Sequence, residues 1–321
     1  MLKFIYIADY MINMKEEKKS KKAWIVILGL FLAWMIIISI ANLLDERKDL
    51  AKDKIAIIPV IGEITTGRSS GFFIESGGAS STRIVENLEN AEKDKSVKAI
   101  ILEINSPGGT VVASEEISNK VKTIEKPVIA WVREIGTSGA YWIASSSDWI
   151  IADKLSVTGS IGVIGSYLEF SKLMEKYGVR YEGLTTGEFK DIGSPYKELS
   201  LDERQLLMGK LNMIHEDFVD EIASNRNMAR DKAAALANGA FYLGKEALQL
   251  GLVDELGDKN KAIEKAKMLA GIEEAELIRY EEKRSLLDAL SQLTSKQAYY
   301  LGRGIGYEIS NNIDKPRLDL L

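Results

Sequence analysis

The sequence predicts an α/β fold, built on a mainly parallel sheet that is covered by helices. Between residues 55 and 185, apolar runs of strand length alternate with stretches of helical spacing, as expected of a parallel sheet. Glycine-rich turns follow several of the predicted strands, at 105–109, 136–140 and 159–165. The 321 residues suffice for one large or two modest domains with a hydrophobic core.

The N-terminal part of the chain contains a segment typical of a membrane anchor. Residues 23–42 are uncharged and apolar, and about 20 such residues suffice for a membrane-spanning helix. A cleaved signal peptide is the alternative, because Ser39-Ile40-Ala41 resembles a cleavage site. The apolar run exceeds the usual signal core of about 7–15 residues, which favours an uncleaved anchor. Lysines at 15–22 precede the segment, but basic residues also follow it, so charge favours a cytoplasmic N-terminus only slightly.

The predicted organisation has five parts, and the start codon is open among Met1, Met11 and Met14. We expect a short cytoplasmic N-terminus at 1–22, a transmembrane anchor at 23–42, a charged linker at 43–54, a folded domain at 55–270 and a helical C-terminal tail at 271–321.

Each element of the folded domain is predicted from its own pattern of apolar residues. Strands are expected at 55–61, 97–104, 128–132, 149–152 and 179–185, with a weak one at 276–280. Helices are expected at 82–93, 111–124, from 138 onward, at 168–177, at 201–226 and at 245–250.

Composition excludes several classes of function. The net charge of −5 argues against a nucleic-acid-binding surface. The absence of cysteine rules out disulfides, thiol catalysis and cysteine metal sites, and a single histidine excludes histidine-rich metal centres. We therefore expect neither a metal nor another cofactor.

Ser138 is the first candidate for chemistry. The predicted strand at 128–132 leads into Gly136–Ala140, after which the residues suit a helix. Ser138 would then stand at a helix N-terminus, where free backbone amides favour developing negative charge. The sequence leaves two interpretations equally open, a catalytic nucleophile and an ordinary N-cap serine.

A serine nucleophile needs a base, and the sequence leaves this base open. The single histidine, His215, lies in a predicted amphipathic helix, which disfavours a catalytic role. A desolvated lysine is the alternative. Lys190 follows a predicted strand beside the apolar Phe189, but the neighbouring Asp191 would raise a lysine pKa. By spacing alone, Lys190 is one candidate among many.

The segment Asn105–Gly109 is the candidate oxyanion hole. It follows a predicted strand and precedes a predicted helix, and its two glycines let backbone amides approach a substrate closely. An ordinary strand-to-helix turn is the alternative interpretation.

Five motifs in order resemble the bacterial signal peptide peptidase A family, in its short single-domain type with one N-terminal anchor. They are Asn105–Gly109, Thr137–Tyr141, Thr158–Gly162, Lys190 with Gly193–Pro195, and Leu250–Glu255. The match covers most of residues 55–257. Each motif alone is weak, but five with sensible spacing are specific.

The resemblance implies a Clp-protease and crotonase-like α/β fold with a serine–lysine dyad. By position, Ser138 matches the nucleophile, Lys190 the general base, Ser160 a serine that orients the lysine, and Gly108, Gly109 and Gly139 the oxyanion hole.

The resemblance also implies a function. The implied function is that of a membrane-anchored serine endopeptidase, which cleaves remnant signal peptides and similar apolar peptides through an acyl-enzyme. The catalytic domain would be extracytoplasmic on a single-pass protein of the cell membrane, and the chains would form a ring-shaped homo-oligomer. Two alternatives remain: a catalytically inactive membrane scaffold, and an acyl-CoA enzyme that uses the 105–109 turn for a thioester oxyanion.

Overall fold

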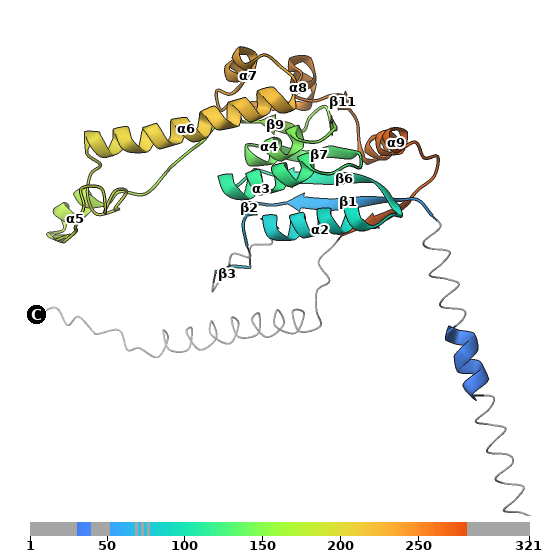
Figure 1. The fold of residues 1–321 in the computed structure, drawn as a ribbon. Helices are drawn as coiled ribbons and strands as arrows, with labels where there is room; N and C mark the ends of the chain where they lie inside the picture. Colours follow the sequence, from blue (N-terminus) through green and yellow to red (C-terminus); the bar gives the residue numbers. More distant parts are fainter. Residues whose placement is uncertain (1–30, 40–51, 68–69, 72–73, 76–77, 281–321) are drawn as a thin grey trace, which may run out of the picture. The chain divides into compact units, whose positions relative to one another are not determined.

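The computed structural model describes residues 31–39, 52–67, 70–71, 74–75 and 78–280 (Figure 1). Of the predicted anchor at 23–42, only residues 31–39 are described, and they form a helix. Within the described ranges, no helix has the length and apolar character needed to cross a membrane. The rest of the predicted anchor, and the tail after residue 280, lie outside the described residues.

The core of the domain is a largely parallel sheet. Its strand order is β10-β9-β7-β6-β1-β12, and β8 and β11 continue from β7. The strands are β1 (Lys54–Ile61), β6 (Val97–Ser106), β7 (Val128–Thr137), β8 (Trp149–Ala152), β9 (Val157–Gly159), β10 (Phe241–Leu243), β11 (Glu255–Leu256) and β12 (Glu276–Arg279). Only the β10–β9 pair is antiparallel among these described pairings. The sheet confirms the predicted α/β class.

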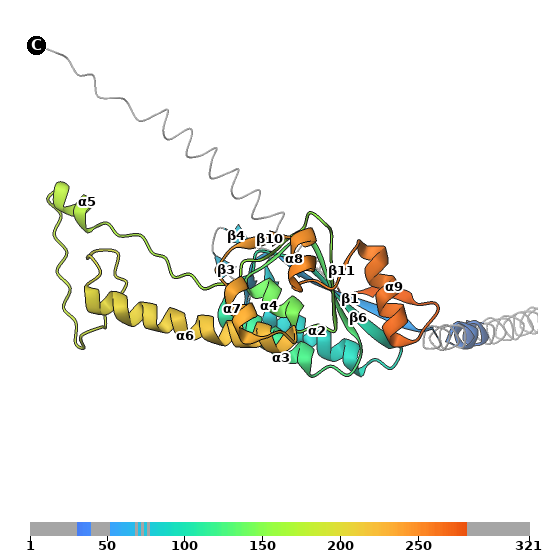
Figure 2. The same ribbon diagram turned by 90° about the horizontal axis from the view of Figure 1, so that it is seen from above.

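Both faces of the sheet are buried, because the strands are apolar on both sides. Ile100, Ile101 and Leu102 on β6 are all fully buried although successive side chains point to opposite faces. On one face, Ile57 and Ile101 pack in a cluster with α9 (Lys259–Ala270). Helices α2 (Ser81–Lys93), α3 (Val111–Lys122) and α4 (Gly139–Ser145) lie on the other side of the sheet (Figures 1 and 2).

Two small sheets lie between β1 and α2. Strand β2 (Ile64–Thr65) pairs in parallel with β5 (Ala79–Ser80), and β3 (Ser70–Gly71) pairs with β4 (Ile74–Glu75). Ile64 also bridges to Gly109, so this segment adjoins the turn after β6.

Helix α6 (Leu201–Asn225) extends beyond the sheet. Its N-terminus carries a capping box formed by Ser200 and Glu203. Its second half packs on α4, where Phe218 stacks on Trp142 with ring centroids 4.7 Å apart. Its first half and α5 (Ser171–Lys176) lie apart from the sheet in both views (Figures 1 and 2). We call residues 163–200, which connect β9 to α6, the arm.

The strand predicted at 179–185 is wrong. These residues form no strand, and all of them are exposed. Their apolar pattern suits a strand, but no neighbouring strand of the described chain lies beside them to complete the hydrogen bonding. The helix predicted at 168–177 is confirmed as the shorter α5.

Two short elements close the domain on the side of β9. Helix α7 (Arg230–Leu236) follows α6, and helix α8 (Gly244–Leu250) follows β10. Helix α8 ends at Gly251, which has a left-handed φ of 83°. The weak strand predicted at 276–280 is confirmed as β12, which pairs with β1.

Candidate active site

Ser138 stands at the junction of β7 and α4 in a strained backbone conformation. Its φ of 54° and ψ of −126° are sparsely populated for a residue other than glycine, at a cost of about 1–3 kcal/mol. The backbone is fixed on both sides, because Ser138 N donates to Gly159 O at 2.8 Å and Trp142 N donates to Ser138 O at 3.0 Å. The Ser138 side chain makes no capping hydrogen bond to the helix. Ser138 therefore occupies the N-cap position of α4 without capping it through its side chain, and the hydroxyl is available for chemistry.

Two unused backbone amides adjoin Ser138. The Gly108 amide donates to Ser106 Oγ at 3.1 Å, whereas the Gly109 and Gly139 amides donate to no group in the described part of the chain. A Cβ atom on Gly139 would lie 3.5 Å from Gly109 N, so these two glycines are neighbours. Two adjacent amides beside a serine hydroxyl can hold an oxyanion.

The turn after β6 requires glycine at both of its last positions. Gly108 has a φ of 99°, and a Cβ atom there would lie 2.9 Å from Gly139 N. A Cβ atom on Gly109 would collide with the Ile64 carbonyl, which accepts a hydrogen bond from Thr110 N at 2.9 Å. Side chains at these positions would push the turn away from Ser138.

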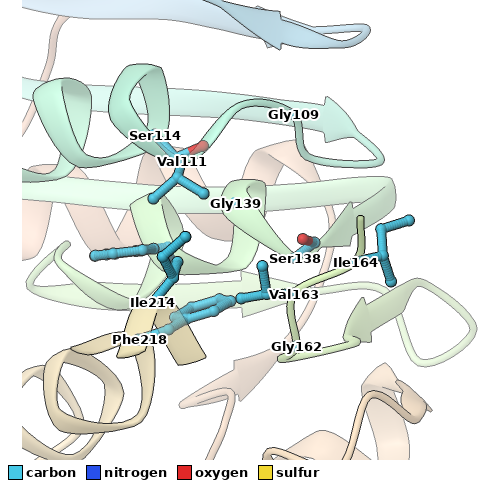
Figure 3. A pocket seen from close by; sticks show the side chains of 11 residues that line it. Gly109, Val111, Ser114, Ser138, Gly139, Gly162, Val163, Ile164, Ile214 and Phe218 are labelled. Atoms are coloured by element: carbon cyan, nitrogen blue, oxygen red, sulfur yellow. The ribbon is translucent and has the colours of Figure 1, made fainter. Parts of the chain in front are cut away.

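A cavity of about 100 Å³ opens beside Ser138. Figure 3 shows the labelled side chains gathered around it; they come from α3, the junction of β7 and α4, the start of the arm and α6. The stacked rings of Trp142 and Phe218 contribute to its wall and are almost fully buried. Val111, Val163 and Ile214 add aliphatic surface. Such a cavity suits a small apolar side chain next to the nucleophile.

Ser160 shares a second, larger cavity of about 700 Å³ with Ser138. Ser160 follows β9 and has a left-handed φ of 48°. Its Oγ donates to Gly239 O at 3.3 Å, and its backbone N donates to Ala240 O at 2.8 Å. The structure therefore brings Ser138, Ser160 and the three predicted oxyanion glycines into one region.

Lys190 is not brought to this region within one chain. It is exposed, lies in the arm, and lines neither of the two cavities. Its neighbour Asp191 is held by Lys197, which also pairs with Glu203 in the first turn of α6. From Glu203 to His215, which lines the larger cavity, the helix rises about 18 Å.

Lys197 does not offer an alternative base. Its Nζ donates to Asp191 Oδ1 and to Glu203 Oε1, each at 2.7 Å. The hydrogen bonds to Asp191 and then to Glu203 raise the pKa of Lys197, so its amine stays protonated.

His215 lines the larger cavity but forms no hydrogen bond with Ser138 in the described structure. Its Nε2 lies 2.8 Å from Ala237 O, which can only accept, so Nε2 carries a proton. Among the described residues, no group of histidine and acidic side chains is arranged to bind a metal ion.

The comparisons with known proteins agree with this fold. The family model described as Peptidase family S49 matches residues 120–273, and the Clp protease model matches residues 68–149. A protein of Methanocaldococcus jannaschii named as a protease is 35% identical over 94% of this chain and 99% of its own length. A protein of Enterococcus faecium named as the signal peptide peptidase SppA is 35% identical over 71% of this chain and 67% of its own length. Protease 4 of Haemophilus influenzae is 36% identical over 68% of this chain and 35% of its own length.

The fold and these matches define a peptidase with a Clp-protease-like α/β fold. The chain belongs to peptidase family S49, and its resemblance to the signal peptide peptidase A type is confirmed.

Two parts of the site were not predicted from the sequence. The first is the aromatic wall of the smaller cavity, because nothing in the sequence pairs Trp142 with Phe218, which lies 76 positions later. The second is the turn at Asn238–Ala240 that contacts Ser160. The Asn-Gly dipeptide at 238–239 is a turn signal that marks this segment as a turn, although it does not reveal what the turn contacts.

Proposed function

We propose that this protein is a membrane-anchored serine endopeptidase that cleaves remnant signal peptides and similar apolar peptides. The observation that carries the proposal is the setting of Ser138. Its hydroxyl makes no capping bond, two unused glycine amides adjoin it, and a small apolar cavity opens beside it.

Ser138 acts as the nucleophile and the glycine amides stabilise the tetrahedral intermediate. The Ser138 oxygen attacks the peptide carbonyl while a base takes its proton, and the carbonyl oxygen becomes an oxyanion beside the Gly109 and Gly139 amides. The same base then returns the proton to the leaving amine. Water hydrolyses the resulting acyl-enzyme, with the base again removing a proton.

Lys190 of a neighbouring copy of this chain supplies that base. The arm keeps Lys190 away from Ser138 of its own chain, and it carries large apolar side chains that lack cover. Ile164 and Leu184 are 90% and 91% exposed, and Leu168 and Tyr177 are each 72% exposed. Apolar surface of this kind marks interaction sites. A ring-shaped homo-oligomer would cover the arm and place each Lys190 at the next Ser138.

The substrate preference and location of the enzyme follow from the same features. The small apolar cavity favours small or apolar side chains at the cleaved bond. Residues 23–42 anchor the chain in the cell membrane, with a cytoplasmic N-terminus and an extracytoplasmic catalytic domain, which is where remnant signal peptides would be met. The reaction requires no metal or cofactor.

The test is peptide hydrolysis by the full chain with two single variants. Wild type is expected to cleave an apolar peptide ester, whereas Ser138→Ala and Lys190→Ala are expected to be inactive and folded. Mixing the two variants during assembly should restore activity, because one chain then offers Ser138 and its neighbour offers Lys190. Lys172→Ala is the matched control, because Lys172 is an arm lysine that pairs with the exposed Glu198. Full activity of Lys190→Ala would refute the serine–lysine dyad. If mixing the two variants restored no activity, the proposal that Lys190 acts on Ser138 of a neighbouring copy would be refuted.

The two alternative functions gain no specific support. An acyl-CoA enzyme needs positive charge for the phosphates, yet among the described residues no lysine or arginine lines either cavity that contains Ser138. An inactive scaffold does not require a strained serine beside unused amides.

A further inference from the structure

His215 makes a single described hydrogen bond, and its acceptor lies at the end of a helix. Ala237 directly follows α7, so its carbonyl has no partner from the helix itself. His215 Nε2 donates to this carbonyl at 2.8 Å across 22 positions of sequence. The bond therefore ties the middle of α6 to the C-terminus of α7.

The residues after Ala237 form a turn that holds Ser160. Asn238 Oδ1 accepts from Ala240 N at 2.9 Å, which closes the turn internally. Gly239 N donates to Ile161 O at 3.0 Å. In the other direction, Ser160 donates to the turn twice, from its N to Ala240 O and from its Oγ to Gly239 O. We call residues 237–240 the clasp.

The clasp determines how the Ser160 hydroxyl is presented. Ser160 has a left-handed φ of 48°, which an isolated chain rarely adopts at serine. Because its proton points to Gly239 O, the lone pairs of Ser160 Oγ are left to accept a hydrogen bond from another group. Ser160 and His215 line the same cavity as Ser138.

We propose that His215 is a positioning residue, which holds the clasp and through it the Ser160 hydroxyl that receives the lysine amine. This inference rests on the proposed serine–lysine mechanism. His215 acts as a hydrogen-bond donor and not as a base. Neutral imidazole protonated on Nε2 and imidazolium both carry this N–H, so the contact does not depend on the charge of the ring.

The test compares two substitutions of His215 in the full chain. In His215→Ala the donor is lost, and kcat for an apolar peptide ester is expected to fall roughly tenfold, the size of one lost hydrogen bond, with KM within about twofold. In His215→Gln an amide N–H replaces the ring N–H, and most of kcat should return.

Two further variants guard against a trivial loss of folding. Asn238→Ala removes the bond that closes the clasp internally and should reproduce the kcat loss of His215→Ala, with KM again within about twofold. Because both act through the clasp, the double variant should lose clearly less than the product of the two single losses. Asp217→Asn, an exposed change on the same helix, is the matched control and should behave as wild type.

Several results would overturn the inference. One is a kcat of His215→Ala equal to that of wild type, and another is an equal loss of kcat in His215→Gln and His215→Ala. A third is a pH–rate profile of wild type governed by a group near 6.5 that disappears when His215 is replaced, because His215 would then act as a base. Suppose that wild type is active, that Ser138→Ala is inactive, and that the His215 variants have the same kcat as wild type. Then only the inference about His215 fails, and the proposed function stands. If wild type is inactive or Ser138→Ala is active, the proposed function fails and the inference fails with it.

Discussion

At the scale of single residues, the site depends on positions where a side chain is missing. Gly108, Gly109 and Gly139 form close contacts with neighbouring backbone or with Ser114, and each contact excludes a Cβ atom. These contacts hold the turn after β6 against the start of α4, and Ser138 lies at that point with its hydroxyl uncommitted. The backbone strain at Ser138 is thus balanced by surrounding hydrogen bonds and packing.

Gly109→Ala is expected to reduce kcat by about 10²–10³-fold, the usual cost of losing one oxyanion donor. The added Cβ would collide with the Ile64 carbonyl and displace the Gly109 amide. Steady-state hydrolysis of a peptide ester measures the effect. Gly67→Ala is the control, because nothing lies within 4 Å of a Cβ atom there. A Gly109→Ala enzyme within about twofold of wild type would show that this amide holds no oxyanion.

At the scale of elements, a largely buried ion pair holds the end of α6 to the segment that follows α8. Arg226, at the end of α6, pairs with Asp254 and donates to Gly251 O. Tyr141 on α4 donates from its hydroxyl to Leu252 O at 2.9 Å. Burial raises the pKa of Tyr141, so its hydroxyl remains protonated and keeps donating. Helices α4, α6 and α8 are therefore joined at one segment.

Arg226→Ala is expected to lower the free energy of unfolding by about 3 kcal/mol, because it leaves the Asp254 carboxylate without its partner in a largely buried place. Arg230→Ala is the matched control. Its ion pairs with Glu216 and Asp220 are exposed to solvent, so its loss should lower the free energy of unfolding clearly less than Arg226→Ala does. Denaturant unfolding of both variants measures the difference, and equal losses would contradict this role for Arg226.

The arm is held to α6 by an ion pair that depends on pH. The hydrogen bond from Lys197 lowers the pKa of Glu203 below its usual 4.5. A carboxylate whose pKa is lowered by folding stabilises the folded state at pH values above its unfolded-state pKa. This contribution to stability is lost as the pH falls through the folded-state pKa. We therefore expect amide hydrogen exchange in residues 190–203 to increase, relative to α3, when the pH falls below about 4.5. Glu203→Gln should show the faster exchange already at neutral pH. If residues 190–203 exchanged their amide hydrogens equally slowly in wild type and in Glu203→Gln at every pH, the Lys197–Glu203 ion pair would not be what holds the arm to α6.

Much of the fold was predictable from the sequence, because the strands of a buried parallel sheet are continuous apolar runs. Strands β1, β6 and β8 lie within two residues of their predicted ranges, whereas β7 begins as predicted but continues to Thr137. Strand β10 and helix α7 were not predicted, because three and seven residues are too few for a clear periodicity. The false strand at 179–185 shows the opposite error, since an apolar pattern does not reveal whether a partner strand is present.

The candidate site was predictable where it depends on local turns and unpredictable where it depends on tertiary contacts. Glycine-rich turns marked residues 105–109 and 136–140 as candidate site segments, whereas only the structure shows that the strands before them, β6 and β7, are neighbours. The distance of Lys190 from Ser138 within one chain has no local signal. The same is true of the bond from His215 to Ala237, because neither residue departs from an ordinary helix pattern.

At the scale of the whole molecule, a single copy of the chain leaves the apolar side chains of the arm exposed to solvent. Leu184→Glu is expected to yield a smaller assembly by light scattering and a loss of activity of about tenfold or more, because it puts a charge into the proposed contact between copies. Leu155→Glu is the control, since Leu155 is 66% exposed in the turn between β8 and β9 and outside the arm. An unchanged assembly with unchanged activity would remove the arm from the proposed contact.

Helix α6 connects the arm to the cavity beside Ser138. Its first turn anchors the arm through Glu203, and its second half supplies Phe218 to the wall of the cavity beside Ser138. If each base comes from the next copy, a newly made chain is harmless to the proteins around it. Hydrolysis would then begin only once enough copies had assembled, so the amount of protein made would determine when this peptidase becomes active.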